Sequence, residues 1–192
     1  MNPLKPRIWK SAVETQQQLL ELGFQTCVIG GIAVQRWGEP RVTKDVDFTL
    51  LCGFGNERRI VSEILRHFDP RVEDAEEFAI RARVLLVEDS RGTPLDISLG
   101  ALPYEENVIA RATPWQAPKS GSLITCSAED LVVLKAFANR TQDIRDIEGV
   151  IIRQGARLNR SLVLKELTPL VELKEETEIL DQLQALFEKY DG

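Results

Sequence analysis

The sequence predicts a mixed α/β core in residues 1–126, followed by a small helical subdomain in residues 127–192. Short apolar and alternating segments, which are typical of strands, crowd the first two thirds of the 192 residues, where helical segments lie between them. The last third carries helical patterns alone. A hydrophobic content of 43% is enough for a packed core. Strands followed by a run of helices indicate an α/β (α+β) architecture with a mixed sheet.

The first elements follow from hydrophobic spacing and from the residues that interrupt it. Gly23 ends a run of apolar residues at helical spacing, and Gly30-Gly31 break a short apolar strand. A short helix starts directly at these glycines, and a loop with Pro40 follows it. The predicted elements of this part are a helix at 8–22, a strand at 26–29, a helix at 32–37 and a strand at 41–51.

The middle of the chain predicts a hairpin. Two apolar segments, 83–87 and 95–99, flank a polar turn at 88–92. The other elements expected here are a helix at 57–68, an ambiguous segment at 75–82, a helix at 104–112, an irregular proline-containing connection at 113–118 and a short strand at 123–126.

The helical region has a clear starting signal. Ser127 and Asp130 have the spacing of a capping box, with Ser127 as the N-cap and Asp130 at the third helical position. The predicted helices cover 128–139, 142–153, 162–173 and 176–190.

Composition excludes several kinds of site. Cys27, Cys52 and Cys126 are odd in number and widely spaced, so they predict buried apolar side chains rather than disulfides or a zinc site. With His67 as the single histidine, metal chemistry has to use oxygen ligands. The N-terminus has no hydrophobic signal core, and no apolar run approaches the roughly 18 residues of a membrane span. We therefore expect a cytoplasmic protein without membrane contact.

Three acidic residues stand in alternating segments. Asp45, Asp47 and Thr49 fall on one face of the strand predicted at 41–51, because successive side chains of a strand point to opposite faces. Asp96 occupies the same kind of position in the strand at 95–99. If these strands are neighbours with their apolar faces down, the three carboxylates converge on one polar surface.

Such a surface suits a divalent metal that carries a triphosphate. Mg²⁺ prefers carboxylate and phosphate oxygens, and two such ions can activate a hydroxyl and stabilise departing pyrophosphate. Gly30-Gly31 at a helix start would let a phosphate approach the backbone, although a tight turn is the simpler explanation of the two glycines taken alone. A solvated strand face is the alternative for the acids, yet acids are disfavoured in strands, and here they occupy two of them.

The helix after Ser127 carries a further candidate. Lys135 would hold a β- or γ-phosphate if it lies above the phosphate site, or it belongs to the wet side of the helix with Arg140. Asp143 and Asp146, three residues apart, share a helix face and could cap the helix, pair with Arg140 or position a substrate. The sequence leaves these alternatives open.

Together these residues resemble a known family. The segments 28–31, 41–47, 95–97 and 135–146 are similar to the AbiEii/AbiGii toxin-type nucleotidyltransferases of the DNA polymerase β-like superfamily. The resemblance covers roughly residues 25–150. It implies a polymerase-β-like nucleotidyltransferase core and Mg²⁺- or Mn²⁺-dependent transfer of an NMP group from an NTP to a hydroxyl acceptor.

The resemblance also implies roles for single residues. Asp45, Asp47 and Asp96 would be the catalytic metal ligands, with Asp96 also a possible base. Gly30 and Gly31 would form the phosphate loop, and Lys135 would contact the nucleotide. The residues with possible accessory roles are Arg41, Thr43, Asp143 and Asp146.

The acceptor and the biological setting have several possible forms. Toxin members of the family typically modify an acceptor such as tRNA and are controlled by an antitoxin protein. A protein or a small molecule is the other kind of acceptor, the latter as in antibiotic-modifying enzymes. A catalytically silent member, which binds a nucleotide or a partner protein without turnover, is the alternative from a different class.

Overall fold

The computed structural model describes residues 6–116 and 121–190, and the contacts within the chain divide it into two units. The first unit contains residues 1–32 and 41–126, and the second contains residues 33–40 and 127–192. The division at 126/127 coincides with the domain boundary expected from the sequence, whereas residues 33–40 group with the helical unit. That residues 1–126 form a nucleotidyltransferase core and residues 127–192 a separate helical subdomain stays a prediction.

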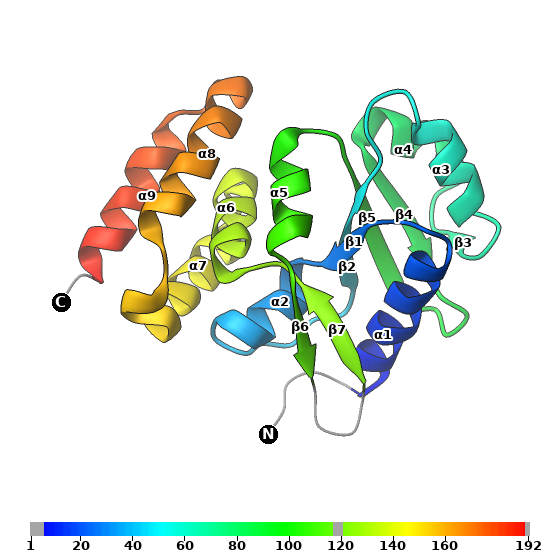
Figure 1. Ribbon diagram of the computed structural model, residues 1–192, viewed down its shortest axis with the longest axis horizontal. Helices are drawn as coiled ribbons and strands as arrows, with labels where there is room; N and C mark the ends of the chain where they lie inside the picture. Colours follow the sequence, from blue (N-terminus) through cyan, green and yellow to red (C-terminus); the bar gives the residue numbers. More distant parts are fainter. Residues whose placement is uncertain (1–5, 117–120, 191–192) are drawn as a thin grey trace. The chain divides into compact units, whose positions relative to one another are not determined.

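The first unit is built on one mixed sheet, which has seven strands within the described residues (Figure 1). Its spatial order is β3-β4-β5-β2-β1-β7-β6. β2 runs parallel to β5 and antiparallel to β1, and β4 and β5 form the expected antiparallel hairpin. The strands are β1 Thr26–Val28, β2 Val46–Leu51, β3 Asp69–Pro70, β4 Val84–Glu88, β5 Pro94–Gly100, β6 Thr113–Gln116 and β7 Ser122–Thr125.

Alternation along the strands separates an apolar from a polar face. Val46, Phe48 and Leu50 of β2 are buried, and Asp47 between them is half-buried. The same alternation along β5 buries its leucine and isoleucine side chains. The sequence pattern therefore predicts the two faces of these strands correctly.

The apolar core is completed by helices α1, α3 and α4. Their buried side chains pack with those of β2, β4 and β5 in one cluster, and α1 also contacts β1 and β7. Trp9 of α1 packs against Trp115 of β6 in a T-shaped arrangement, with ring centroids 4.9 Å apart. The helices of this unit are α1 Pro6–Glu21, α3 Glu57–Ile64, α4 Ala75–Ala82 and α5 Pro103–Arg111, and α2 Gly30–Trp37 begins in it.

Four elements differ from the sequence-based expectations. The helix expected at 57–68 ends at Ile64, and the ambiguous segment at 75–82 is helix α4. β3 pairs with β4 where no strand was expected. The irregular connection expected at 113–118 is wrong for 113–116, which form edge strand β6, while 117 and 118 lie outside the described residues. Pro114 fits there because an edge strand leaves one side without ladder bonds.

The strand expected at 41–51 is also shorter than predicted. β2 begins at Val46, so Asp45 lies just before the strand rather than in it. The Thr43 hydroxyl donates to the Asp45 carboxylate (Oγ1 to Oδ1 2.9 Å). Such a local side-chain bond competes with extended backbone, which explains why strand pairing starts only after Asp45, at Val46.

The turn between β4 and β5 is fixed by the buried carboxylate of Asp89. Its Oδ1 accepts hydrogen bonds from the backbone N–H groups of Arg91 and Thr93, both at 2.9 Å. Its Oδ2 accepts from the Ser11 hydroxyl of α1 at 2.5 Å. Burial alone would raise the pKa of Asp89, but these hydrogen bonds outweigh it and hold the pKa below its usual value.

We expect Asp89→Asn to lower the free energy of unfolding by about 2 kcal/mol at pH 7, because one of these buried acceptors becomes a donor. The folded-state pKa of Asp89 is depressed, so its contribution is present above about pH 5 and is lost as pH falls through that pKa. The difference between wild type and variant should therefore shrink toward about pH 3. Urea unfolding at several pH values measures it. Glu88→Gln is the matched control, and an equal loss there would contradict the assignment.

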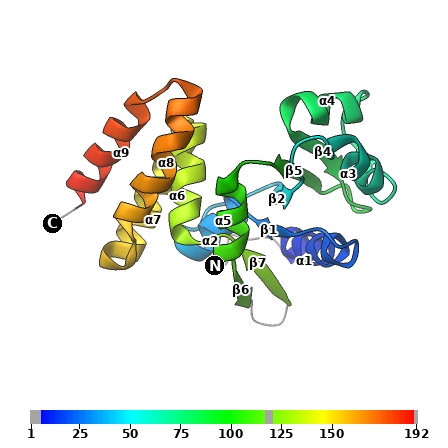
Figure 2. The ribbon, with the colours of Figure 1, turned by 45° about the horizontal axis from the view of Figure 1, so that its top comes forward.

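The second unit is helical, as the sequence predicts for its last third (Figure 2). Ser127 caps its first helix by accepting from the backbone N–H of Asp130 at 3.0 Å, which confirms the predicted cap. Residues 33–40 join this unit through the carbonyls of Trp37 and Gly38, which accept from Gln154 and Arg153. Its elements are α6 Ala128–Ala138, α7 Thr141–Gln154, the 3-10 turn η1 Gly155–Arg157, α8 Arg160–Lys174 and α9 Glu178–Lys189, with α8 beside α9.

Two expectations from composition can be compared with the described residues. Cys27, Cys52 and Cys126 are buried free thiols, as predicted. Within residues 6–116 and 121–190, no helix is both long and apolar enough to cross a membrane.

Candidate functional site

Two of the three predicted acids face each other across adjacent strands. In the parallel pair β2–β5, Asp47 is in direct register with Asp96. Neighbouring strands lie about 4.8 Å apart, and partners in register point to the same face. The convergence expected from the sequence depended on these two strands being neighbours, and the register shows that they are, so the carboxylates of Asp47 and Asp96 emerge side by side.

Asp45 approaches the same place from the segment before β2. Its negative charge acts on the carboxyl of Asp96. Burial is the main cause that raises the pKa of Asp96; the guanidinium of Arg71 opposes it, and the charge of Asp45 adds to it. Asp96 is therefore linked to Asp47 by strand register and to Asp45 by charge, and we call these three acids the carboxylate cluster.

The two glycines make room for this cluster. Gly30 has a φ of +59°, and a Cβ built on it would come within 2.0 Å of Asp47 Oδ2. A Cβ on Gly31 would come within 2.4 Å of Thr43 Oγ1, the hydroxyl that holds Asp45. The backbone N–H of Gly31, at the start of α2, donates to Asp47 Oδ2 at 3.3 Å. Asp47 and Thr43 therefore approach the backbone of these glycines so closely that neither position has room for a side chain. A phosphate loop at Gly30 and Gly31 stays a prediction.

We expect Gly30→Ala to destabilise the protein by about 3 kcal/mol, because it combines a positive φ with a clash against the carboxylate of Asp47. Gly23→Ala is the matched control, since Gly23 has a φ of +84° with open space around its Cβ position. The control should cost only about 1 kcal/mol. Thermal or urea unfolding of both variants measures the difference. Equal losses would show that the contact with Asp47 contributes nothing.

Asp96 has a basic partner that the sequence analysis missed. Nη2 of Arg71 donates to Asp96 Oδ1, and both side chains are partly buried, with exposures of 27% and 34%. Arg71 lies 25 residues before Asp96 and directly follows β3, a strand that was not predicted. No local pattern connects the two residues, so only the order of strands β3, β4 and β5 could have revealed the pair.

Each carboxylate of the cluster is turned toward its own protein donor. Asp45 accepts from Thr43, Asp47 from Gly31, and Asp96 from Arg71. As these side chains stand, no three histidine, cysteine or acidic side chains among residues 6–116 and 121–190 converge closely enough to hold a metal ion. A metal bound here would require side-chain rotations that bring the oxygens together.

The predicted phosphate contact Lys135 lies in the second unit and is held by two carboxylates. Its Nζ is 2.6 Å from Asp143 Oδ1 and 2.7 Å from Asp146 Oδ2, and all three side chains are at least 93% buried. The alternative that Lys135 lies on the wet side of α6 is therefore wrong. Asp143 also accepts from Arg140 Nε at 2.6 Å. Burial would raise the pKa of Asp143, but hydrogen bonds from Arg140 and Lys135 hold it below its usual value.

The accessory residues from the loop before β2 have separate positions. Thr43 is buried and connects Gly31 to Asp45, as described above. The guanidinium of Arg41 donates to the carbonyl of its neighbour Val42 at 3.3 Å. Direct roles for Arg41, Thr43, Lys135, Asp143 and Asp146 in nucleotide transfer stay predictions.

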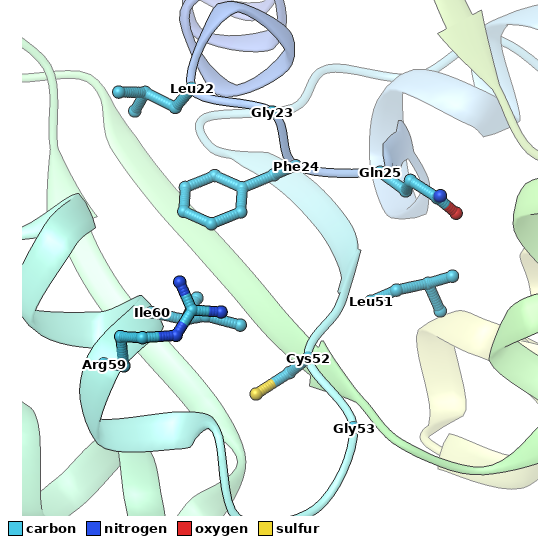
Figure 3. A pocket seen from close by; sticks show the side chains of 9 residues that line it. All are labelled: Leu22, Gly23, Phe24, Gln25, Leu51, Cys52, Gly53, Arg59 and Ile60. Atoms are coloured by element: carbon cyan, nitrogen blue, oxygen red, sulfur yellow. The ribbon is translucent and has the colours of Figure 1, made fainter.

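A pocket of about 390 Å³ opens at the other end of β2 (Figure 3). Its lining includes Phe24, Cys52 and Arg59, and Figure 3 shows the Arg59 guanidinium between the Phe24 ring and the Cys52 thiol. Burial, together with the charge of Glu57, raises the pKa of the Cys52 thiol, so the thiol stays protonated and is a poor nucleophile. None of the three clustered carboxylates lines this pocket.

Comparisons with known proteins identify the fold. No family model matches the chain, and no curated protein matches it by sequence. An antigenic nucleotidyltransferase-like protein from Paracoccidioides brasiliensis is similar in structure, with a TM-score of 0.51 and 17% identity over 93% of this chain and 94% of the other. The lincosamide antibiotic adenylyltransferase LnuA, solved with lincomycin bound, has a TM-score of 0.50 and 12% identity over 73% and 94%. The chain therefore has the mixed α/β fold of nucleotidyltransferase-like proteins.

Proposed function

We propose that this protein is a nucleotidyltransferase that moves an NMP group from an NTP to a hydroxyl acceptor and releases pyrophosphate, with Mg²⁺ or Mn²⁺ as the cofactor. The observation that carries the proposal is the register of Asp47 with Asp96 on parallel strands, beside the charge of Asp45. The likeness to nucleotidyltransferase-like folds supports it. At sequence identities of 12–17%, the structural likeness supports the fold, and the reaction is tested by the experiment below.

The donor set of the cluster fits a hard divalent cation. Three carboxylates supply oxygen ligands of the kind that Mg²⁺ and Mn²⁺ prefer. Asp45, Asp47 and Asp96 would hold the metal, which when bound would supply charge neutralisation for the triphosphate and a lower pKa for the acceptor hydroxyl. The hydrogen bonds that now hold these carboxylates include those from the Thr43 hydroxyl, the Gly31 backbone N–H and the Arg71 guanidinium, and a bound metal would have to exchange or share them.

The other roles in the proposed reaction, proton transfer and the orientation of the carboxylates, fall to residues of the chain itself. Asp96 Oδ1 is bound by Arg71, while Oδ2 makes no hydrogen bond among the described residues, so Oδ2 is the atom that would take the proton of the acceptor hydroxyl. Gly31 orients Asp47 through its backbone N–H. Thr43 orients Asp45 through its hydroxyl. These donors hold the three carboxylates as they stand, and metal binding would exchange or share these hydrogen bonds.

Two observations favour a small cationic acceptor as the more specific form of this function. The net charge of −6 favours positively charged acceptors over polyanionic RNA, because charge complementarity steers association. One structural neighbour is named as an antibiotic adenylyltransferase, which is a transfer to a small molecule. Transfer to tRNA with control by an antitoxin, as the toxin resemblance implies, is the competing form.

Label transfer tests the proposal. The purified protein would be incubated with Mg²⁺ and each α-labelled NTP, starting with ATP, in the presence of tRNA, cell protein or a pool of cationic metabolites. Label that appears in one fraction and disappears with Asp45→Ala would support the reaction and identify the acceptor class. NTP binding without label in any fraction would replace the proposal with a silent nucleotide-binding protein. Label that persists with Asp45→Ala would reject the carboxylate cluster as the site.

A further inference from the structure

Arg71 lies in one row with the acids of the site. The backbone N–H of Arg71 donates to the carbonyl of Leu86 at 3.1 Å. Leu86 is in register with Asp96 on β5, and Asp96 is in register with Asp47 on β2. The row therefore starts at Arg71, just after β3, and crosses β4, β5 and β2, and the Arg71 side chain passes over β4 to reach Asp96, a span of about 10 Å. The backbone hydrogen bond to Leu86 therefore places Arg71 beside β4, directly after the end of β3.

The Arg71 guanidinium takes the place of a cation at Asp96. It contacts only one of the two carboxylate oxygens, and its positive charge lies directly beside that carboxylate. A divalent cation bound to the same carboxylate would have to displace or share this contact. Two positive charges beside one carboxylate repel each other, so the guanidinium opposes metal binding at Asp96.

We propose that Arg71 is the internal counter-cation of the metal site, which stabilises Asp96 in the empty protein and competes with the divalent metal for it. This inference rests on the proposed function and adds a residue that sets the metal affinity of the site. Arg71 acts through Asp96 and is therefore a positioning residue. Its positive charge also offsets the negative charge of Asp45 beside Asp96 when the metal is absent.

Binding of Mn²⁺ alone, measured by the electron paramagnetic resonance of free Mn²⁺ or by calorimetry, tests the proposal without any turnover. Arg71→Ala should bind Mn²⁺ about tenfold more tightly than wild type, because a repelling charge is removed. Arg71→Lys keeps the charge and should stay within about twofold of wild type. Arg66→Ala is the matched control, since Arg66 is an exposed arginine that pairs with Glu63. It should leave Mn²⁺ affinity unchanged.

A double variant locates the effect. Arg71→Ala/Asp96→Asn should lose the gain in affinity, because the carboxylate for which the two cations compete is gone. If the wild type binds Mn²⁺ and Arg71→Ala binds it with equal or lower affinity, the inference is overturned and the proposed function still stands. Absence of Mn²⁺ binding in wild type and in Arg71→Ala alike would overturn both. Circular dichroism of each variant shows that the affinities refer to folded protein.

Discussion

Replacing Asp47 with asparagine is expected to abolish nucleotide transfer while the fold is retained. Asp47 stands between the start of α2 and Asp96, so it is the central acid of the cluster. An asparagine oxygen can still accept the hydrogen bond from the backbone N–H of Gly31, and its volume is the same. The negative charge that would hold a divalent cation is lost. A loss of about 4 kcal/mol in transition-state stabilisation corresponds to about a thousandfold in rate.

The label-transfer rate, compared with the free energy of unfolding, measures this result. Wild-type stability with lost transfer would separate a role in the reaction from a role in folding. Asp69→Asn is the matched control, because Asp69 is an exposed acid on edge strand β3 of the same sheet. It should retain full activity. Transfer by Asp47→Asn at the wild-type rate would eliminate the proposed metal-ligand role of Asp47.

Replacing Lys135 with methionine is expected to lower the free energy of unfolding by about 3–5 kcal/mol. The ammonium of Lys135 lies between Asp143 and Asp146, which are 1% and 3% exposed. Its removal leaves buried carboxylates with less compensation, although Arg140 still donates to Asp143. The cost of uncompensated buried charge exceeds the small loss of apolar volume.

Lys189→Met provides the contrast within the same helical unit. Lys189 is 58% exposed and pairs with Glu148, and exposed pairs contribute little to stability because solvent screens them. Urea unfolding of the two variants should therefore differ by several kcal/mol. Adding Asp146→Asn to Lys135→Met should restore part of the loss, because one buried charge is removed with its partner. If Lys135→Met were as stable as Lys189→Met, the buried ion cluster would have no structural importance, and the nucleotide contact would become the stronger explanation.

Alternation is what made most of the fold predictable from the sequence. Asp47 and Asp96 each stand between apolar residues at a period of two, so their faces are determined locally. The apolar faces then have to be buried together, which makes β2 and β5 compatible neighbours. Helical periodicity and the cap at Ser127 determined the helical unit in the same way. Local rules suffice where backbone geometry alone decides the direction of a side chain.

Long-range contacts decided the rest, because no sequence pattern encodes them. The contact of Arg71 with Asp96 depends on the order of the strands β3, β4 and β5, and the burial of Lys135 depends on how α6 packs against α7. Edge strand β6 forms by antiparallel pairing with β7, which the local sequence at 113–116 does not reveal.

The sequence by itself determined the α/β core, the faces of the acid-bearing strands and the helical end of the chain. The tertiary structure alone decided which donor holds each carboxylate, and why Gly30 and Gly31 have no side chains: the atoms of Asp47 and Thr43 occupy that space. The difference has one physical reason, since alternation and capping act between residues a few positions apart, whereas charge pairing and steric fit act between whatever residues the packed sheet brings together.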